Sequence, residues 1–166
     1  MIRKATATFT RPANITPYAT GDEISNSTTA GDAVAMEFAG LTETSPADGK
    51  ILQAKLYTNA QGFTGDVKMY LYDSEPTMSG DNSPHVITPS DAANLVGFVI
   101  WSTAYASPTG STASVNFVSP GLAFVSKNRT AGNPLYGVLV ARGAITPASG
   151  QTFSVELLCE SVINTR

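Results

Sequence analysis

The feature that most restricts the fold of this chain is a succession of short apolar or alternating runs separated by turn-forming residues. About eight to ten such runs occur, with turns rich in Gly, Pro, Asn or Asp roughly every 10 to 15 residues. Only one stretch carries a helix signal. This pattern is typical of an antiparallel sandwich or barrel, and the number of runs favours a jelly roll, which has about eight strands. We therefore predict an all-β protein, an antiparallel β-sandwich of the jelly-roll type.

The most regular strand pattern flanks a long polar excursion. Val67, Met69 and Leu71 alternate with more polar residues, which is the period of a strand with one buried face. Residues 73–89 contain three prolines together with acids and amides, which indicates a loop. An apolar run at 96–101 then returns to strand character. We predict that 67–72 and 96–101 belong to one scaffold.

The other expected strands are shorter or less regular. Residues 2–9 form either a strand or an extended arm, and 51–59 is ambiguous between helix and strand, with the flanking turns and an in-phase Leu52, Ala54 and Leu56 favouring a strand. Further strands are expected at residues 23–27, 33–39, 113–119, 122–126, 135–142 and 152–163.

One short helix is expected near residues 90–96. Pro89, Ser90 and Asp91 precede the sequence Ala-Ala-Asn-Leu-Val, and Ser90 or Asp91 could accept a hydrogen bond from an early backbone N–H. Residues 1–30 are interpreted as an N-terminal arm or edge strand, and residues 31–166 as a single β-sandwich domain.

Length and composition limit the kinds of partner. A chain of 166 residues can bury one sizeable core. Charged residues make up only 14%, below the usual quarter, which is common in β-rich proteins that work in assemblies or outside cells. The net charge is −3 and the ten basic residues are scattered, so we expect no nucleic-acid partner. No signal peptide or run of about 20 apolar residues is seen, so we expect synthesis in a cytoplasm and no membrane partner.

The reactive residue types are too few for the usual catalytic sites. Cys159 is in phase with Phe153, Val155 and Leu157, which predicts a buried, inert thiol. His85 is the single histidine and lies in a proline-flanked loop, where we interpret it as exposed; it has no partner motif for a triad. We therefore predict no enzymatic activity and no cofactor.

Two other kinds of site stay open from the residues alone. Zinc has too few ligands, whereas calcium could use loop oxygens, although ordinary solvated acids are the favoured interpretation. The loop oxygens in question belong to Asp22, Glu23, Asp73, Glu75, Asp81 and Asn82. Nothing pairs the carboxylates of Glu37, Glu43 and Glu156 for glycoside hydrolysis. A sugar-binding platform could use Tyr18, Tyr105 or Tyr136.

Two stretches carry a resemblance to a known group of proteins. Residues 6–27 (TATFTRPANITPYATGDEISNS) contain an Arg-Pro-Ala motif after a strand and a Tyr-x-x-Gly-Asp turn. Residues 67–99 contain a strand, an Asp-x-x-Pro-Thr turn, an Asp-Asn loop and a Ser-Asp-Ala-Ala helical turn. In this order the motifs resemble small structural proteins of tailed bacteriophages.

The resemblance implies a β-sandwich component of the virion. Several such proteins are decoration or cement proteins on the outer capsid surface, commonly trimers, so it implies the major capsid protein as partner and the virion as location. It implies no catalytic residue. The alternative is a receptor- or carbohydrate-binding β-module of a phage tail or fibre.

The N-terminal residues are the expected contact region. If residues 1–18 form an arm, its backbone can add to a neighbouring sheet edge, and Arg3, Lys4 and Arg11 can meet an acidic shell surface, with Tyr18 completing the contact set. If residues 2–9 are instead an edge strand of the chain's own sandwich, deleting residues 1–18 would unfold the domain.

Overall fold

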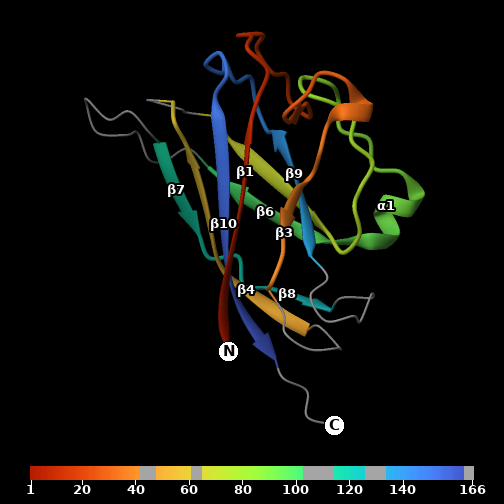
Figure 1. The fold of residues 1–166 in the computed structure, drawn as a ribbon, viewed down its shortest axis with the longest axis vertical. Helices are drawn as coiled ribbons and strands as arrows, with labels where there is room; N and C mark the ends of the chain where they lie inside the picture. Colours follow the sequence, from red (N-terminus) through yellow and green to blue (C-terminus); the bar gives the residue numbers. More distant parts are fainter. Residues whose placement is uncertain (42–47, 61–64, 103–113, 126–133, 163–166) are drawn as a thin grey trace.

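The computed structural model describes residues 1–41, 48–60, 65–102, 114–125 and 134–162, and these form two antiparallel sheets packed as a sandwich (Figure 1). The first sheet contains β1 (Ile2–Thr10), β4 (Asp48–Thr58), β7 (Ser114–Val118), β8 (Leu122–Val125) and β10 (Thr152–Val162). The second sheet contains β2 (Glu23–Ile24), β3 (Met36–Phe38), β5 (Val67–Tyr72), β6 (Leu95–Trp101) and β9 (Leu135–Ala141). A 3-10 turn, η1 (Ala30–Asp32), and one helix, α1 (Pro89–Asn94), complete the described elements.

The strand pairing is that of a jelly roll. The first sheet has the order β1-β10-β4-β7, with β8 also on β4, and the second has the order β2-β9-β5-β6, with β3 also on β9. The pairs are therefore nested: β1 with β10, β2 and β3 with β9, β4 with β7 and β8, and β5 with β6. Such nesting is what results when one long antiparallel ribbon is wound into a sandwich. The predicted fold class is confirmed.

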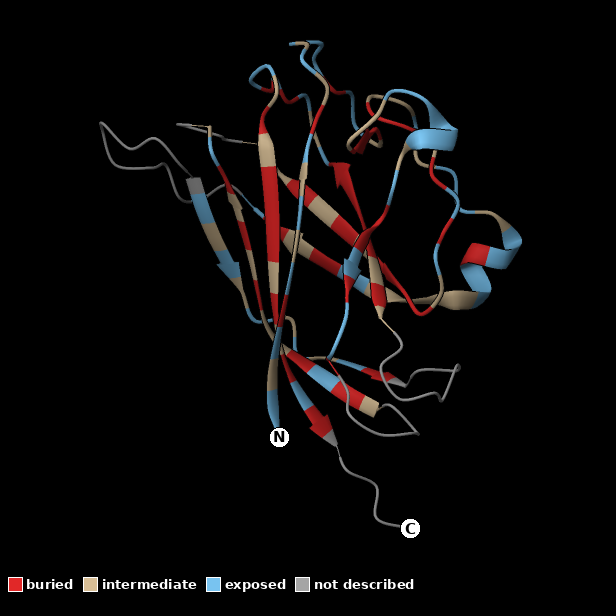
Figure 2. Ribbon diagram, viewed as in Figure 1, coloured by how far each residue is buried: buried red, intermediate tan, exposed pale blue. Residues whose placement is uncertain are grey.

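The core lies between the sheets and follows the predicted alternation. Val67, Met69 and Leu71 of β5 are fully buried, and so are the inward residues of β10, which end at Cys159 (Figure 2). Trp101 joins the layers, because its Nε1 donates to the carbonyl oxygen of Ala54 on β4 at 3.2 Å. Burial raises the pKa of the Cys159 thiol to about 12. The prediction of a buried thiol at this position is confirmed.

The ambiguous segment at 51–59 belongs to the strand β4, apart from its last residue. The register between β4 and β10 shifts at Leu158/Cys159, so that Gln53 is opposite Leu158 while Ile51 is opposite Cys159. This bulge adds one residue to β4 and reverses its alternation there. Ile51 and Ala54 are buried, whereas Leu52 is only partly so. The predicted in-phase position of Leu52 is therefore wrong, and the bulge explains why the segment also looked helical.

The helix begins one residue earlier than expected and has a different cap. Thr88 is the N-cap: its hydroxyl oxygen accepts from the backbone N–H of Asp91, and the Asp91 carboxylate accepts from the backbone N–H of Thr88. This reciprocal pair is a capping box, so Asp91 takes part but neither it nor Ser90 is the cap residue. Among the described elements, no helix is long and apolar enough to cross a membrane.

Candidate interaction surfaces and the loop network

A buried ion pair joins the segment after β1 to the excursion between β5 and β6. The Arg11 guanidinium lies 3.1 Å from a carboxylate oxygen of Asp81, and both side chains are fully buried. The second Asp81 oxygen accepts from the Tyr18 hydroxyl at 2.5 Å and from the Ser25 backbone N–H at 3.1 Å. Burial, followed by the neighbouring Asp81 carboxylate, raises the pKa of Tyr18 well above its ordinary value.

A second buried carboxylate lies next to this pair. The Glu23 side chain accepts from the backbone N–H groups of Ser79 and Gly80, both at 2.9 Å, and contacts His85 Nδ1 at 2.6 Å. His85 Nε2 lies 3.0 Å from the hydroxyl of Tyr72. The His85 side chain is only 4% exposed, so its interpretation as an exposed loop histidine is wrong. It is buried because Glu23, from β2, and Tyr72, from β5, enclose it.

We call the set Arg11, Tyr18, Glu23, Asp81 and His85 the loop network. Two of its members come from residues beyond 67 and three from the first 27, so the two stretches that carry the phage resemblance lie against each other. A backbone bridge between Asp22 and Pro84 extends this contact, and a second bridge joins Tyr18 to Ile145. The positions of these polar residues in the sequence do not show that they are partners, because their contacts form only in the folded chain.

Three of the loop acids considered for calcium bind other groups of the protein. Asp81 faces Arg11, Glu23 faces His85, and Asp22 accepts from the backbone N–H of Ala19 at 2.7 Å. In the described ranges no group of three or more His, Cys, Asp or Glu residues could hold a metal ion.

The four predicted contact residues divide into two pairs. Arg3 donates to the carbonyl oxygen of Gly40 at 3.5 Å, and Lys4, 60% exposed, pairs with Glu156 at 3.3 Å. These two lie at the surface of β1, where contact with a partner stays a prediction. Arg11 and Tyr18 lie inside the loop network, so their side chains do not reach the surface in this structure. The sequence pattern could not separate the two pairs, because it does not show which distant residues approach Arg11 and Tyr18.

β1 forms an edge strand and has an open backbone edge. Met1 and Ser161 exchange two hydrogen bonds, and the Arg11 N–H donates to the carbonyl of Gln151. In an antiparallel ladder, hydrogen-bonded pairs alternate with pairs that are not hydrogen-bonded. The odd-numbered residues of β1 therefore direct their backbone N–H and C=O groups toward β10. The even-numbered residues, such as Thr6 and Thr8, direct theirs away from it. Among the described strands, β1 pairs with β10 alone. Of the two alternatives for residues 2–9, the structure has the edge strand.

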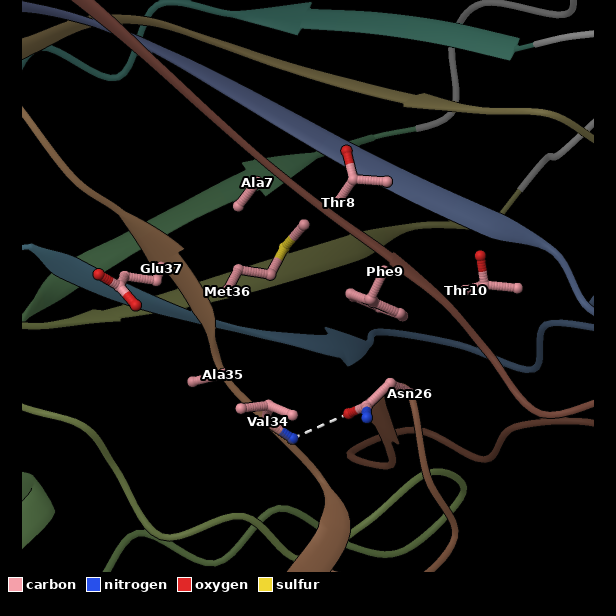
Figure 3. A pocket seen from close by; sticks show the side chains of 9 residues that line it. All are labelled: Ala7, Thr8, Phe9, Thr10, Asn26, Val34, Ala35, Met36 and Glu37. Carbon is pink, nitrogen blue, oxygen red and sulfur yellow. Dashed lines mark hydrogen bonds between the residues drawn. The ribbon is translucent and has the colours of Figure 1, made fainter.

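A groove runs beside this open edge, where the first sheet approaches the second (Figure 3). Its volume is about 410 Å³. Phe9 and Met36 provide apolar surface, and the backbone N–H of Val34 is held by the Asn26 side chain at 2.8 Å. The full lining is Ala7, Thr8, Phe9, Thr10, Asn26, Val34, Ala35, Met36 and Glu37. A backbone edge beside a groove with both polar and apolar lining residues can accept a short extended segment.

Large apolar side chains are also exposed on the opposite side of the sandwich. β6 and β7 end their respective sheets there, and the two strands contact each other. Phe98 of β6 is 51% exposed, and Val115 and Phe117 of β7 are 43% and 54% exposed. Phe98 lies on the outer face of the second sheet, and Val115 and Phe117 lie on the outer face of the first. Exposed apolar side chains on edge strands are characteristic of surfaces that contact other proteins.

The residues considered for sugar chemistry are not gathered in the described part of the chain. Tyr18 is buried and Tyr136 is half-buried. Although burial opposes ionisation of Glu156, hydrogen bonds from Lys55 and Lys4 lower the pKa of its carboxyl. Tyr105 and Glu43 lie outside the described residues.

Comparisons with known proteins found similarity in structure only. No known family and no curated protein matches the sequence. The decameric BFDV capsid protein is 11% identical, with 98% of this chain and 99% of that one covered and a TM-score of 0.36. The capsid of Helicobacter pylori bacteriophage KHP30 gives 9% identity, coverage of 98% and 97%, and a TM-score of 0.32. A carbohydrate-binding module of the Cellvibrio mixtus lichenase 5A gives 8% identity, coverage of 89% and 98%, and a TM-score of 0.31. These similarities are distant, and they include a carbohydrate-binding module as well as two viral capsid proteins.

Proposed function

We propose that this chain is a structural virion protein that binds the outer surface of a phage head as a homotrimer and reinforces it. The observation that carries the proposal is the contact between its two phage-like stretches. Arg11 and Tyr18, from the first stretch, share the carboxylate of Asp81, from the second. Each motif alone is weak support for the resemblance to phage proteins. Contact between their residues in one buried cluster strengthens that support.

The surface of the sandwich fits this role. The open edge of β1 and the exposed side chains of Phe98, Val115 and Phe117 offer several modest contact areas. A protein that decorates a repeating shell acts through many copies, so modest contacts multiplied by valence are sufficient.

Two measurements on the purified full chain test the proposal. Light scattering gives the native mass, and co-sedimentation with heads that lack this protein gives binding. We expect a trimer that sediments with the heads and raises their resistance to heat or dilution. A monomer that stays in the supernatant at all head concentrations would contradict the proposal.

A carbohydrate- or receptor-binding module is the second candidate. It is favoured by an open depression of about 270 Å³ on the second sheet, where the ring of Tyr70 lies near Lys68 and Arg142. Aromatic rings beside polar groups are suited to sugars as well as to proteins. This candidate predicts binding to a glycan array without any capsid, and the decoration proposal predicts none.

A further inference from the structure

The excursion between β5 and β6 covers only part of the outer face of the second sheet. Tyr72, Val138 and Val140 point to that face and are buried in a small cluster with Ala35 and Met78. Lys68 and Tyr70 share the face, as do their cross-strand neighbours on β6, yet they stay partly open. We call this open part, formed by Lys68, Tyr70, Phe98, Ile100 and Arg142, the Lys68 face.

The cation at the centre of the Lys68 face is held in place. The ammonium of Lys68 lies 4.2 Å from the ring centres of both Tyr70 and Phe98, and it donates to the Tyr70 hydroxyl at 2.9 Å. Attraction to two aromatic rings orients the Lys68 side chain without neutralising it. Phe98 remains half exposed beside it, so the Lys68 face combines a fixed positive charge with apolar surface.

The positive charges of this face have no acidic partner in the described part of the chain. No ion pair there joins Lys68 or Arg142 to a carboxylate, whereas Lys4 and Lys55, on the first sheet, both pair with Glu156. Lys68 and Arg142 border the same 270 Å³ depression. In a chain of net charge −3, this unpaired positive region is complementary to negative charge on a partner.

We propose that the Lys68 face docks an acidic surface of the shell protein, with carboxylates meeting Lys68 and Arg142 and apolar side chains covering Phe98. This inference rests on the proposed function. A protein surface fits better than an anionic glycan because Phe98 and Ile100 need apolar cover, which a sugar acid supplies poorly. The apolar and charged parts together match the composition of protein interfaces.

The test is co-sedimentation of the full chain with heads that lack it, with Lys68→Glu as the variant and Lys50→Glu as the matched control. Lys50 is exposed on β4 of the first sheet, so both changes alter the net charge equally on different faces. We expect Lys68→Glu to weaken binding about tenfold, and Phe98→Ala to weaken it at least threefold, with Lys50→Glu within twofold of the original chain. Added salt should weaken the original chain more than Lys68→Glu.

A second readout needs no variant. A carbodiimide, which joins amines to carboxylates at contact distance, should link Lys68 to an Asp or Glu of the shell protein in the assembled complex. If the original chain binds heads but Lys68→Glu binds equally well and Lys68 forms no cross-link, the inference fails and the proposed function stands. If the original chain binds no heads, both fail. Binding of the Lys68 face to anionic glycans in place of heads also overturns it.

Discussion

Arg11 and Asp81 are 70 positions apart in the chain, yet they form an ion pair of 3.1 Å with both side chains excluded from solvent. Each charged group is costly to bury alone, and the pair tolerates burial because Tyr18, Ser25 and Asn14 satisfy the remaining donors and acceptors. This relationship fixes the segment after β1 against the excursion that follows β5.

Removing one member of this pair should therefore destabilise the folded state strongly. Arg11→Met leaves the Asp81 carboxylate buried without its counter-ion, and we expect a loss of about 3–5 kcal/mol in the free energy of unfolding, measured by urea denaturation. Combining it with Asp81→Leu should recover part of the loss, because no lone charge remains. A change below about 1 kcal/mol for Arg11→Met would contradict a buried pair.

The Glu23 carboxylate should tolerate even an isosteric change poorly. In Glu23→Gln the charge is lost and one side-chain oxygen becomes an NH₂ group, which would face either the N–H groups of Ser79 and Gly80 or the Nδ1 atom of His85. We expect a loss of about 2 kcal/mol in thermal or chemical unfolding, because buried hydrogen bonds to a charged acceptor are weakened or lost. Glu37→Gln, on the exposed side of β3, is the control and should change stability by less than about 0.5 kcal/mol.

Alkaline pH should destabilise the protein from about pH 9 upward through Cys159. The pKa of its thiol is 9.0 ordinarily and about 12 when folded, so the folded state holds this proton more tightly. The stabilisation is therefore complete below pH 9 and is lost as pH rises toward 12, by at most about 1.4 kcal/mol per pH unit. Between pH 9 and 10, before the tyrosines with ordinary pKa 10.0 contribute fully, Cys159→Ala should show a flatter profile in urea denaturation. Equal slopes for the two proteins would refute this assignment.

Two substitutions distinguish the capping role of Thr88 from that of the nearby Ser90. Thr88→Ala removes the hydroxyl that accepts from the Asp91 N–H, and we expect a loss of about 1 kcal/mol in thermal unfolding. Ser90→Ala should cost clearly less, because Ser90 is exposed and makes no contact with the first backbone N–H groups of α1 that would cap them. The reverse order would restore Ser90 as the cap.

Deleting residues 1–18 should yield an unfolded product. The deletion removes β1, which pairs with β10 over nine residue positions, and with it Arg11 and Tyr18 of the loop network. Circular dichroism and proteolysis of the shortened chain check this. A folded domain that merely fails to bind heads would show instead that residues 1–18 act as a separable arm.

The sequence alone determined the fold class, because inward and outward residues alternate with the period of a strand wherever one face is buried. Val67, Met69 and Leu71 of β5, and Cys159 of β10, were assigned to the core correctly on that basis. The short helix was also foreseeable, since proline and capping residues act locally. The sequence pattern gave two wrong predictions. A bulge reversed the alternation in β4, and Thr88 is the N-cap of α1 where Ser90 or Asp91 was expected.

Only the tertiary structure decided which polar residues are partners. His85 and Arg11 looked exposed along the chain, and they are buried because Glu23 and Asp81 approach them from other elements. Lys68 and Arg142 are 74 positions apart and border one depression because β5 pairs with β9. Hydrogen bonds and charge pairs of this kind depend on distances in space, which sequence separation does not constrain. The alternation of the strands can therefore be predicted from the sequence, whereas the loop network and the Lys68 face are visible only in the tertiary structure.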